Sequence, residues 1–138
     1  MNVRSCLIPA FAIWATTVTA QTAPALSPEA FEAATTGRTF TFAAPGATQP
    51  YGAERYLPGR RVVWSWLNGD VCQFGEWFVD LELICFVYET DGSPQCWSFY
   101  AEADGMTAQF ENLEDSAPRY NLTETDADLD CTGPLFGS

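Results

Sequence analysis

The sequence predicts a mostly β domain: an antiparallel meander of seven or eight strands that forms a small closed or nearly closed barrel, with one short N-terminal helix. Apolar and polar residues alternate in several short segments, as in Arg38-Thr39-Phe40-Thr41-Phe42, a pattern typical of half-buried strands. Turn residues recur about every ten residues, without a helical pattern between them. Because an open meander leaves two edges unpaired, closure is favoured. An immunoglobulin-like sandwich is less favoured because its long crossover connections have no counterpart here.

The helix is predicted between Leu26 and Gly37. Ser27 suits the N-cap, Pro28 the first helical position and Glu29 the first turn. Gly37 ends the helix. Leu26 and Phe31 are spaced to pack across the cap as a hydrophobic staple.

Strands are predicted where alternating or β-branched and aromatic segments are bounded by turn residues. A turn is expected over Thr90–Pro94 because Asp-Gly-Ser-Pro is rich in turn formers. The expected strands are Arg38–Phe42, Tyr51–Leu57, Arg61–Leu67, Trp77–Val79, Leu83–Tyr88, Cys96–Ala101, Met106–Phe110 and Arg119–Thr123.

The length and composition indicate one folded domain. The chain has 138 residues, of which 47% are hydrophobic and 17% charged, which is enough apolar surface for an independent core. Residues 1–20 resemble a cleaved signal peptide, with Arg4, an apolar run, and Val18 and Ala20 before the cleavage point. We expect residues 21–25 to be a linker and residues 26–138 to be the domain. The predicted location is periplasmic or secreted, with no membrane attachment after cleavage.

The domain contains four cysteines, which in an exported protein predict two disulfides. If the strands Leu83–Tyr88 and Cys96–Ala101 pair around a turn centred between Thr90 and Asp91, Cys85 lies opposite Cys96, close enough to be bridged. Elimination then pairs Cys72 with Cys131.

The absence of residue types excludes several enzyme classes. The chain has no Lys and no His, so Ser-His and Cys-His nucleophiles, lysine Schiff bases, P-loops and His-ligated zinc sites are excluded. Asp126-x-Asp128-x-Asp130 resembles the start of a calcium loop, but Cys131 and Gly137 occupy the positions of its Gly and Glu. We therefore predict no enzymatic activity, no cofactor and no metal; a carboxylate-only hydrolase is the rival class.

The charge is strongly acidic. Removal of residues 1–20 leaves five arginines against 18 acidic residues, a formal charge of −13. Such a charge disfavours nucleic acid and anionic lipid and favours a basic partner, for example a basic envelope protein. Solubility alone explains the same charge. If such a partner exists, the acidic loops are expected to contact it, with these candidates: Glu111, Glu114, Asp115, Asp126 and Asp128.

One candidate ligand site combines arginines and tyrosines within a short segment. Guanidinium groups there could bind a carboxylate or phosphate of a small ligand. The alternative is that the arginines pair with neighbouring acidic residues. The residues are Tyr51, Arg55, Tyr56, Arg60 and Arg61.

A second candidate site consists of tryptophans. Trp64 and Trp66 share a strand face, and Trp97 is predicted opposite Ile84. Together with Trp77 they could line the mouth of the barrel and hold a small apolar ligand. The alternative is a packed aromatic core without a cavity, since eight strands leave room for little more than side chains.

The order Cys72-x-x-Gly75-x-Trp77, Ile84-Cys85-Phe86-x-Tyr88 and Cys96-Trp97-x-Phe99 resembles short exported bacterial proteins without an assigned activity. This resemblance implies a disulfide-stapled exported domain. A weaker likeness is to small β-barrel periplasmic lysozyme inhibitors, which carry Ser-Gly-x-x-Tyr. In Gly52-Ala53-Glu54-Arg55-Tyr56 an extra residue separates Gly from Tyr, and Tyr51 replaces Ser, so the inhibitory residues are not carried over.

The sequence therefore predicts an exported, non-enzymatic binding or interaction module. The alternatives within that class are a carrier of a small apolar ligand and an inhibitor of a basic, envelope-active hydrolase. These alternatives differ in whether the barrel interior is hollow or filled.

Overall fold

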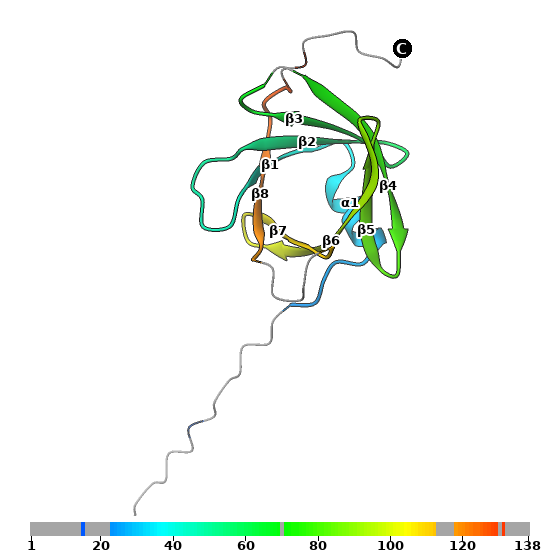
Figure 1. The fold of residues 1–138 in the computed structure, drawn as a ribbon. Helices are drawn as coiled ribbons and strands as arrows, with labels where there is room; N and C mark the ends of the chain where they lie inside the picture. Colours follow the sequence, from blue (N-terminus) through cyan, green and yellow to red (C-terminus); the bar gives the residue numbers. More distant parts are fainter. Residues whose placement is uncertain (1–14, 16–22, 70, 113–117, 130, 132–138) are drawn as a thin grey trace, which may run out of the picture.

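A computed structural model describes residues 15, 23–69, 71–112, 118–129 and 131. In this part of the chain, eight antiparallel strands form a closed barrel in which each strand pairs with its sequence neighbours and β1 pairs with β8 (Figure 1). A single helix precedes them in the same described residues. The predicted fold class is confirmed, and the barrel is closed.

The strands follow the predicted segments closely, although β4 begins earlier and β6 is longer than expected. Their bounds are β1 Thr39–Ala43, β2 Gly52–Leu57, β3 Arg61–Trp66, β4 Cys72–Asp80, β5 Leu83–Tyr88, β6 Asp91–Glu102, β7 Gly105–Phe110 and β8 Tyr120–Thr125. The aromatic pair Phe40 and Phe42 faces the interior, as the alternation in β1 predicts.

The expected turn at Thr90–Pro94 is wrong, because Asp91–Pro94 belong to β6. The register shifts between Phe86 and Tyr88, so that Cys85 lies opposite Cys96 while Tyr88 lies opposite Asp91. Such an irregularity accommodates Gly and Pro inside a strand because not every backbone N–H there has to pair. The turn formers therefore mark a bulge within the strand.

The helix α1, Pro28–Thr35, closes one end of the barrel. Ser27 caps it by accepting a hydrogen bond from Ala30 N–H, and Pro28 occupies its first turn. Phe31 is fully buried, with its ring centroid 5.3 Å from Trp77 and 4.4 Å from Phe99. Figure 1 shows α1 within the outline of the strands. The helix therefore acts as a plug for the end of the barrel at which β2 and β4 finish.

Both predicted disulfides are confirmed among the described residues. Cys85–Cys96 links the neighbouring strands β5 and β6, and Cys72–Cys131 closes a span of 59 residues. In the loop-entropy model the shorter link stabilises the fold by about 3 kcal/mol and the longer by about 4 kcal/mol. Two disulfides indicate an oxidising, non-cytoplasmic compartment.

The segment after β8 crosses the outer face of the sheet. Ala53 and Ser65 point outward from β2 and β3 but are buried, and they share a small cavity with Leu129. Cys131, bonded to Cys72 at the start of β4, holds this segment in place. A part of the barrel that faces outward is thereby shielded from water.

Within the described residues, no helix is long and apolar enough to cross a membrane. The predicted signal peptide, residues 1–20, lies outside the described residues except for Ala15, as do linker residues 21 and 22.

Replacement of Phe31 by Ala should destabilise the domain by about 3 to 5 kcal/mol, because it removes a fully buried aromatic ring and leaves a cavity. Urea unfolding followed by circular dichroism measures this loss. Phe78→Ala is the matched control, since Phe78 lies on the outer side of β4 and is 37% exposed. Equal destabilisation by the two substitutions would contradict the role of α1 as a plug.

Candidate functional site

The end of the barrel opposite α1 opens into an aromatic cavity of about 160 Å³. Side chains from β1 to β6 and from the loop before β2 surround it. They are Phe42, Tyr51, Glu54, Trp64, Trp66, Gln73, Phe86, Tyr88, Gln95, Trp97 and Phe99. We call this cavity the aromatic mouth. Apart from Tyr88, seven of these eleven side chains are aromatic, so the cavity wall is largely apolar.

Two glycines make room for the rings that form the mouth. A Cβ atom on Gly52 would overlap the ring of Trp64, and a Cβ on Gly75 would come within 2.8 Å of the Tyr88 ring. Gly52 therefore lets Trp64 lie flat against β2. Gly75, opposite Tyr88 in the β4–β5 register, lets the tyrosine ring lie across β4 inside the barrel.

The tyrosine ends at a buried carboxyl group. The Tyr88 hydroxyl lies 2.9 Å from Glu54 Oε1 and 2.8 Å from Glu54 Oε2. Glu54 is only 2% exposed. Its position follows from strand alternation, because Gly52, Glu54 and Tyr56 share the inner face of β2. A carboxyl group is thus held at the floor of the aromatic mouth.

Burial governs the protonation of this group. Removal from water raises the pKa of Glu54 to about 8, and the hydrogen bond from Tyr88 opposes that rise in part. Burial and the carboxylate of Glu54 also raise the pKa values of Tyr56 and Tyr88, and burial raises that of Tyr51 to about 12. At neutral pH the three tyrosines are neutral, and Glu54 is mostly protonated.

The structure brings together half of the predicted ligand residues. Tyr51, Trp64, Trp66 and Trp97 all line the aromatic mouth. The rings of Trp64 and Trp66 lie 5.3 Å apart, and Tyr51 contacts both. Trp97 lies opposite Ile84, as predicted. Trp77 is separate from this group, at the plugged end beside Phe31.

The arginine and tyrosine segment does not form one site. Tyr56 is buried among core rings. Arg60 lies 3.3 Å from Glu32 and stacks on the ring of Trp77, 4.5 Å from its centroid. Arg55 and Arg61 line different recesses on the outside of the barrel. Strand alternation separates these residues, because consecutive side chains point to opposite faces.

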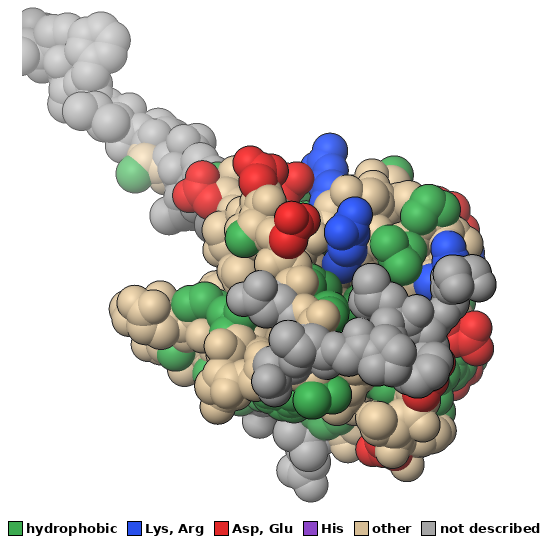
Figure 2. Space-filling view, turned by 90° about the horizontal axis from the view of Figure 1, so that it is seen from above, with side chains coloured by type: hydrophobic (Ala, Val, Ile, Leu, Met, Phe, Trp, Pro, Cys, Tyr) green, Lys and Arg blue, Asp and Glu red, His purple; other side chains and the backbone are tan. Residues whose placement is uncertain are grey.

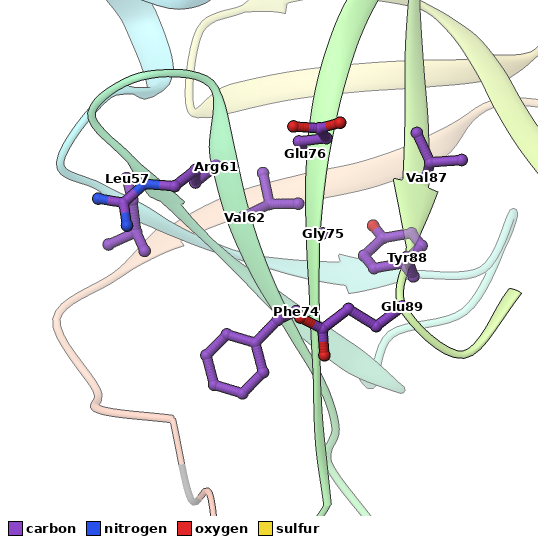
Figure 3. A pocket seen from close by; sticks show the side chains of 9 residues that line it. All are labelled: Leu57, Arg61, Val62, Phe74, Gly75, Glu76, Val87, Tyr88 and Glu89. Atoms are coloured by element: carbon purple, nitrogen blue, oxygen red, sulfur yellow. The ribbon is translucent and has the colours of Figure 1, made fainter. Parts of the chain in front are cut away.

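The recess beside Arg61 lies on the outer side of β3, β4 and β5. Figure 3 shows it around Gly75, whose missing side chain leaves the backbone open between Phe74, Glu76 and Tyr88. Its volume, about 450 Å³, exceeds that of the aromatic mouth. Its walls are surface side chains such as Arg61 and Glu89, so a ligand would stay largely in water. Among the described residues only Tyr88 lines both this recess and the mouth.

The predicted acidic contact surface is dispersed. Asp126 and Asp128 follow β8 and line a recess with Arg38 and Arg55, whereas Glu111 follows β7 at the opposite end of the barrel. Glu114 and Asp115 lie outside the described residues. Figure 2 shows acidic and arginine side chains beside one another on one face. Within the described residues there is no cluster of acidic and Cys side chains that could hold a metal ion.

Sequence reasoning missed Glu54 and Tyr88, which are the polar centre of the mouth. A signal for Glu54 was present: it alternates with Gly52 and Tyr56, so a strand with Tyr56 inward also places Glu54 inward. Alternation with the buried Ile84 and Phe86 likewise places Tyr88 on the inner face of β5, but its path over Gly75 depends on the pairing of β4 with β5.

Comparison with known proteins adds no relative. No family model, curated protein or solved structure matches this chain.

The buried carboxyl should make stability fall as the pH rises. In the unfolded chain Glu54 ionises near its ordinary pKa of 4.5, whereas in the folded barrel it retains its proton up to about pH 8. Between these values ionisation favours the unfolded state, and the contribution of this group falls by up to about 1.4 kcal/mol per pH unit.

Glu54→Gln isolates this contribution, because the amide cannot ionise and replaces a carboxyl that is mostly neutral. The difference in unfolding free energy between the native protein and the variant should change between pH 5 and pH 8 in favour of the variant. Urea titrations at several pH values measure it. A pH-independent difference would show that Glu54 ionises normally in the fold.

Proposed function

We propose that this domain is a non-enzymatic binding module that takes a small, largely apolar ligand into the aromatic mouth. The observation that carries the proposal is the asymmetry of the barrel interior. Phe31 and its neighbours fill one end, whereas at the other end aromatic rings surround an open space. Concave, aromatic-lined spaces with few polar groups are the usual form of small-molecule sites.

The size of the mouth limits the ligand. A volume of about 160 Å³ is close to that of an engineered apolar cavity of about 150 Å³ that binds benzene. The ligand, or the part of it that enters the barrel, is therefore about as large as one aromatic ring. Trp66 and Leu67 extend the apolar surface outward at the rim, where they are 45% and 51% exposed.

The alternative, inhibition of a basic hydrolase through acidic loops, has less support. Asp126 and Asp128 share their recess with Arg38 and Arg55, which reduces the local negative charge. Glu111 lies at the other end of the barrel from them. We infer a periplasmic or secreted location from the predicted signal peptide, and the two disulfides agree with export.

Toluene is a suitable first probe because it matches the size and polarity of the mouth. It should bind saturably and change the tryptophan fluorescence, since three tryptophans line the cavity. Trp66→Ala removes one ring of the rim and should weaken binding about tenfold, equivalent to about 1.4 kcal/mol. Fluorescence titration, supported by isothermal calorimetry, measures both affinities.

Phe74→Ala is the matched control, since Phe74 is an aromatic residue of the outer recess and not of the mouth. It should leave toluene affinity unchanged. If toluene and similar one-ring compounds fail to bind the native protein, or if Phe74→Ala weakens them as much as Trp66→Ala does, the mouth is not the binding site.

A further inference from the structure

We propose that the ligand of the aromatic mouth is a small organic cation, with its ammonium group on Glu54 and its hydrocarbon part against the rings. This inference rests on the proposed function and specifies the chemical class of its ligand. Three features support it: the identity of the polar groups in the cavity, the free hydrogen-bonding capacity of Glu54, and the aromatic walls.

The first feature is the sign of the charged side chain. Of the eleven side chains that line the mouth, only Glu54 can carry a charge near neutral pH, and none is an arginine. The arginines described above lie on the outer side of the barrel or at its plugged end. A ligand that enters the mouth therefore meets a potential negative charge without a compensating cation. An anionic ligand would be repelled by Glu54 in its ionised form.

The second feature is the set of acceptor positions left on Glu54. A carboxylate offers about four lone-pair positions on its two oxygens. The Tyr88 hydroxyl has a single proton to donate and lies within hydrogen-bond distance of both oxygens. Among the described residues, Tyr88 alone forms a hydrogen bond with the Glu54 side chain. The remaining positions suit a donor with several N–H groups, such as a primary ammonium.

The third feature is the aromatic wall. Tyr51, Trp64 and Trp66 form a contiguous group of rings at the mouth, with centroid distances of 5.3 to 5.8 Å. The faces of such rings attract cations, most strongly when water is excluded. The same rings bury hydrocarbon. An aromatic box with one carboxyl at its floor thus matches a compact cation attached to an apolar group.

Binding of a cation should release a proton. In the empty barrel Glu54 is mostly protonated at pH 7, because its pKa is about 8. An ammonium group favours the ionised carboxylate, so up to one proton leaves the protein for each ligand bound. The groups that face Glu54 are Tyr51, Tyr56 and Tyr88, whose pKa values are raised; they stay neutral in this range and do not take up the proton.

The test compares four probes of similar size by isothermal calorimetry on the full chain: benzylammonium, benzyl alcohol, toluene and benzoate. Benzylammonium should bind at least tenfold more tightly than benzyl alcohol at pH 8, and benzoate should bind least. The affinity for benzylammonium should rise by up to about tenfold per pH unit from pH 6 to pH 8, because the free-energy cost of ionising Glu54 falls as the pH rises. Titration in buffers of different ionisation enthalpy measures the released proton.

Glu54→Gln is the decisive variant, because it keeps the shape of the side chain and removes its charge. It should abolish the preference for benzylammonium, the pH dependence and the proton release, while the variant still binds toluene. Toluene binding by the variant also shows that the mouth is folded. Glu89→Gln, which removes a carboxylate of the outer recess and not of the mouth, should retain the preference for the cation and serves as the matched control.

The outcomes separate the two proposals. If none of the probes binds, the proposed function itself fails. If toluene and benzyl alcohol bind as tightly as benzylammonium, or if Glu54→Gln retains the preference for the cation, the mouth is an apolar site and the inference of a cationic ligand is wrong.

Discussion

The hydrogen bonds between β1 and β8 set the geometry on which the rest of the molecule depends. They join residues 39–43 to residues 121–125 and convert the meander into a closed ring. Once eight strands are closed, the interior is wide enough for side chains and for little else. The side chains that point inward therefore decide which part of the barrel is solid and which part can hold another molecule. Both strand edges are also paired, which removes sites for aggregation.

The interior is divided between two kinds of chemistry. At one end Phe31 enters from outside the sheet and completes a core of rings and aliphatic side chains. At the other end the rings stand around Glu54, which is buried without a cationic partner among the described residues. Ionisation of that carboxyl in the empty barrel is costly, and a bound cation would offset the cost. The buried carboxyl of Glu54 thus lowers the stability of the empty protein but would favour the binding of a cation. Such conflicts between stability and function are common at functional sites.

The sequence predicted the barrel, the helix and the Cys85–Cys96 disulfide because these follow from local patterns and one register argument, whereas the Cys72–Cys131 disulfide was predicted by elimination alone. Phe40 and Phe42 show the strand period, and Ser27 and Pro28 show the start of the helix. Cys85 lies opposite Cys96 as the hairpin register predicts, although a bulge replaces the expected turn over Thr90–Pro94. The tryptophan group was also accessible, since Trp64 and Trp66 share a face. The arginine segment, a candidate site in the sequence, is not brought together in the fold because proximity along a strand does not place Arg55 and Tyr56 on the same face. Glu54 and Tyr88 are 34 residues apart and meet only because Gly75 lies between them in the fold, a contact that no local pattern encodes.

The position of Phe31 also has a consequence for the order in which the protein assembles. Its helix comes before all the described strands, yet its ring contacts come from β2, β4, β5 and β6. The helix therefore has no surface to dock on until those strands have met, and a structure with eight residues of helix is marginal by itself. We therefore expect this helix, which is synthesised before the described strands, to become ordered late, together with the β1–β8 contacts of large sequence separation. A barrel that has not yet bound the helix would expose the aromatic residues that Phe31 covers, so we expect the domain to be most prone to aggregation just before the helix docks.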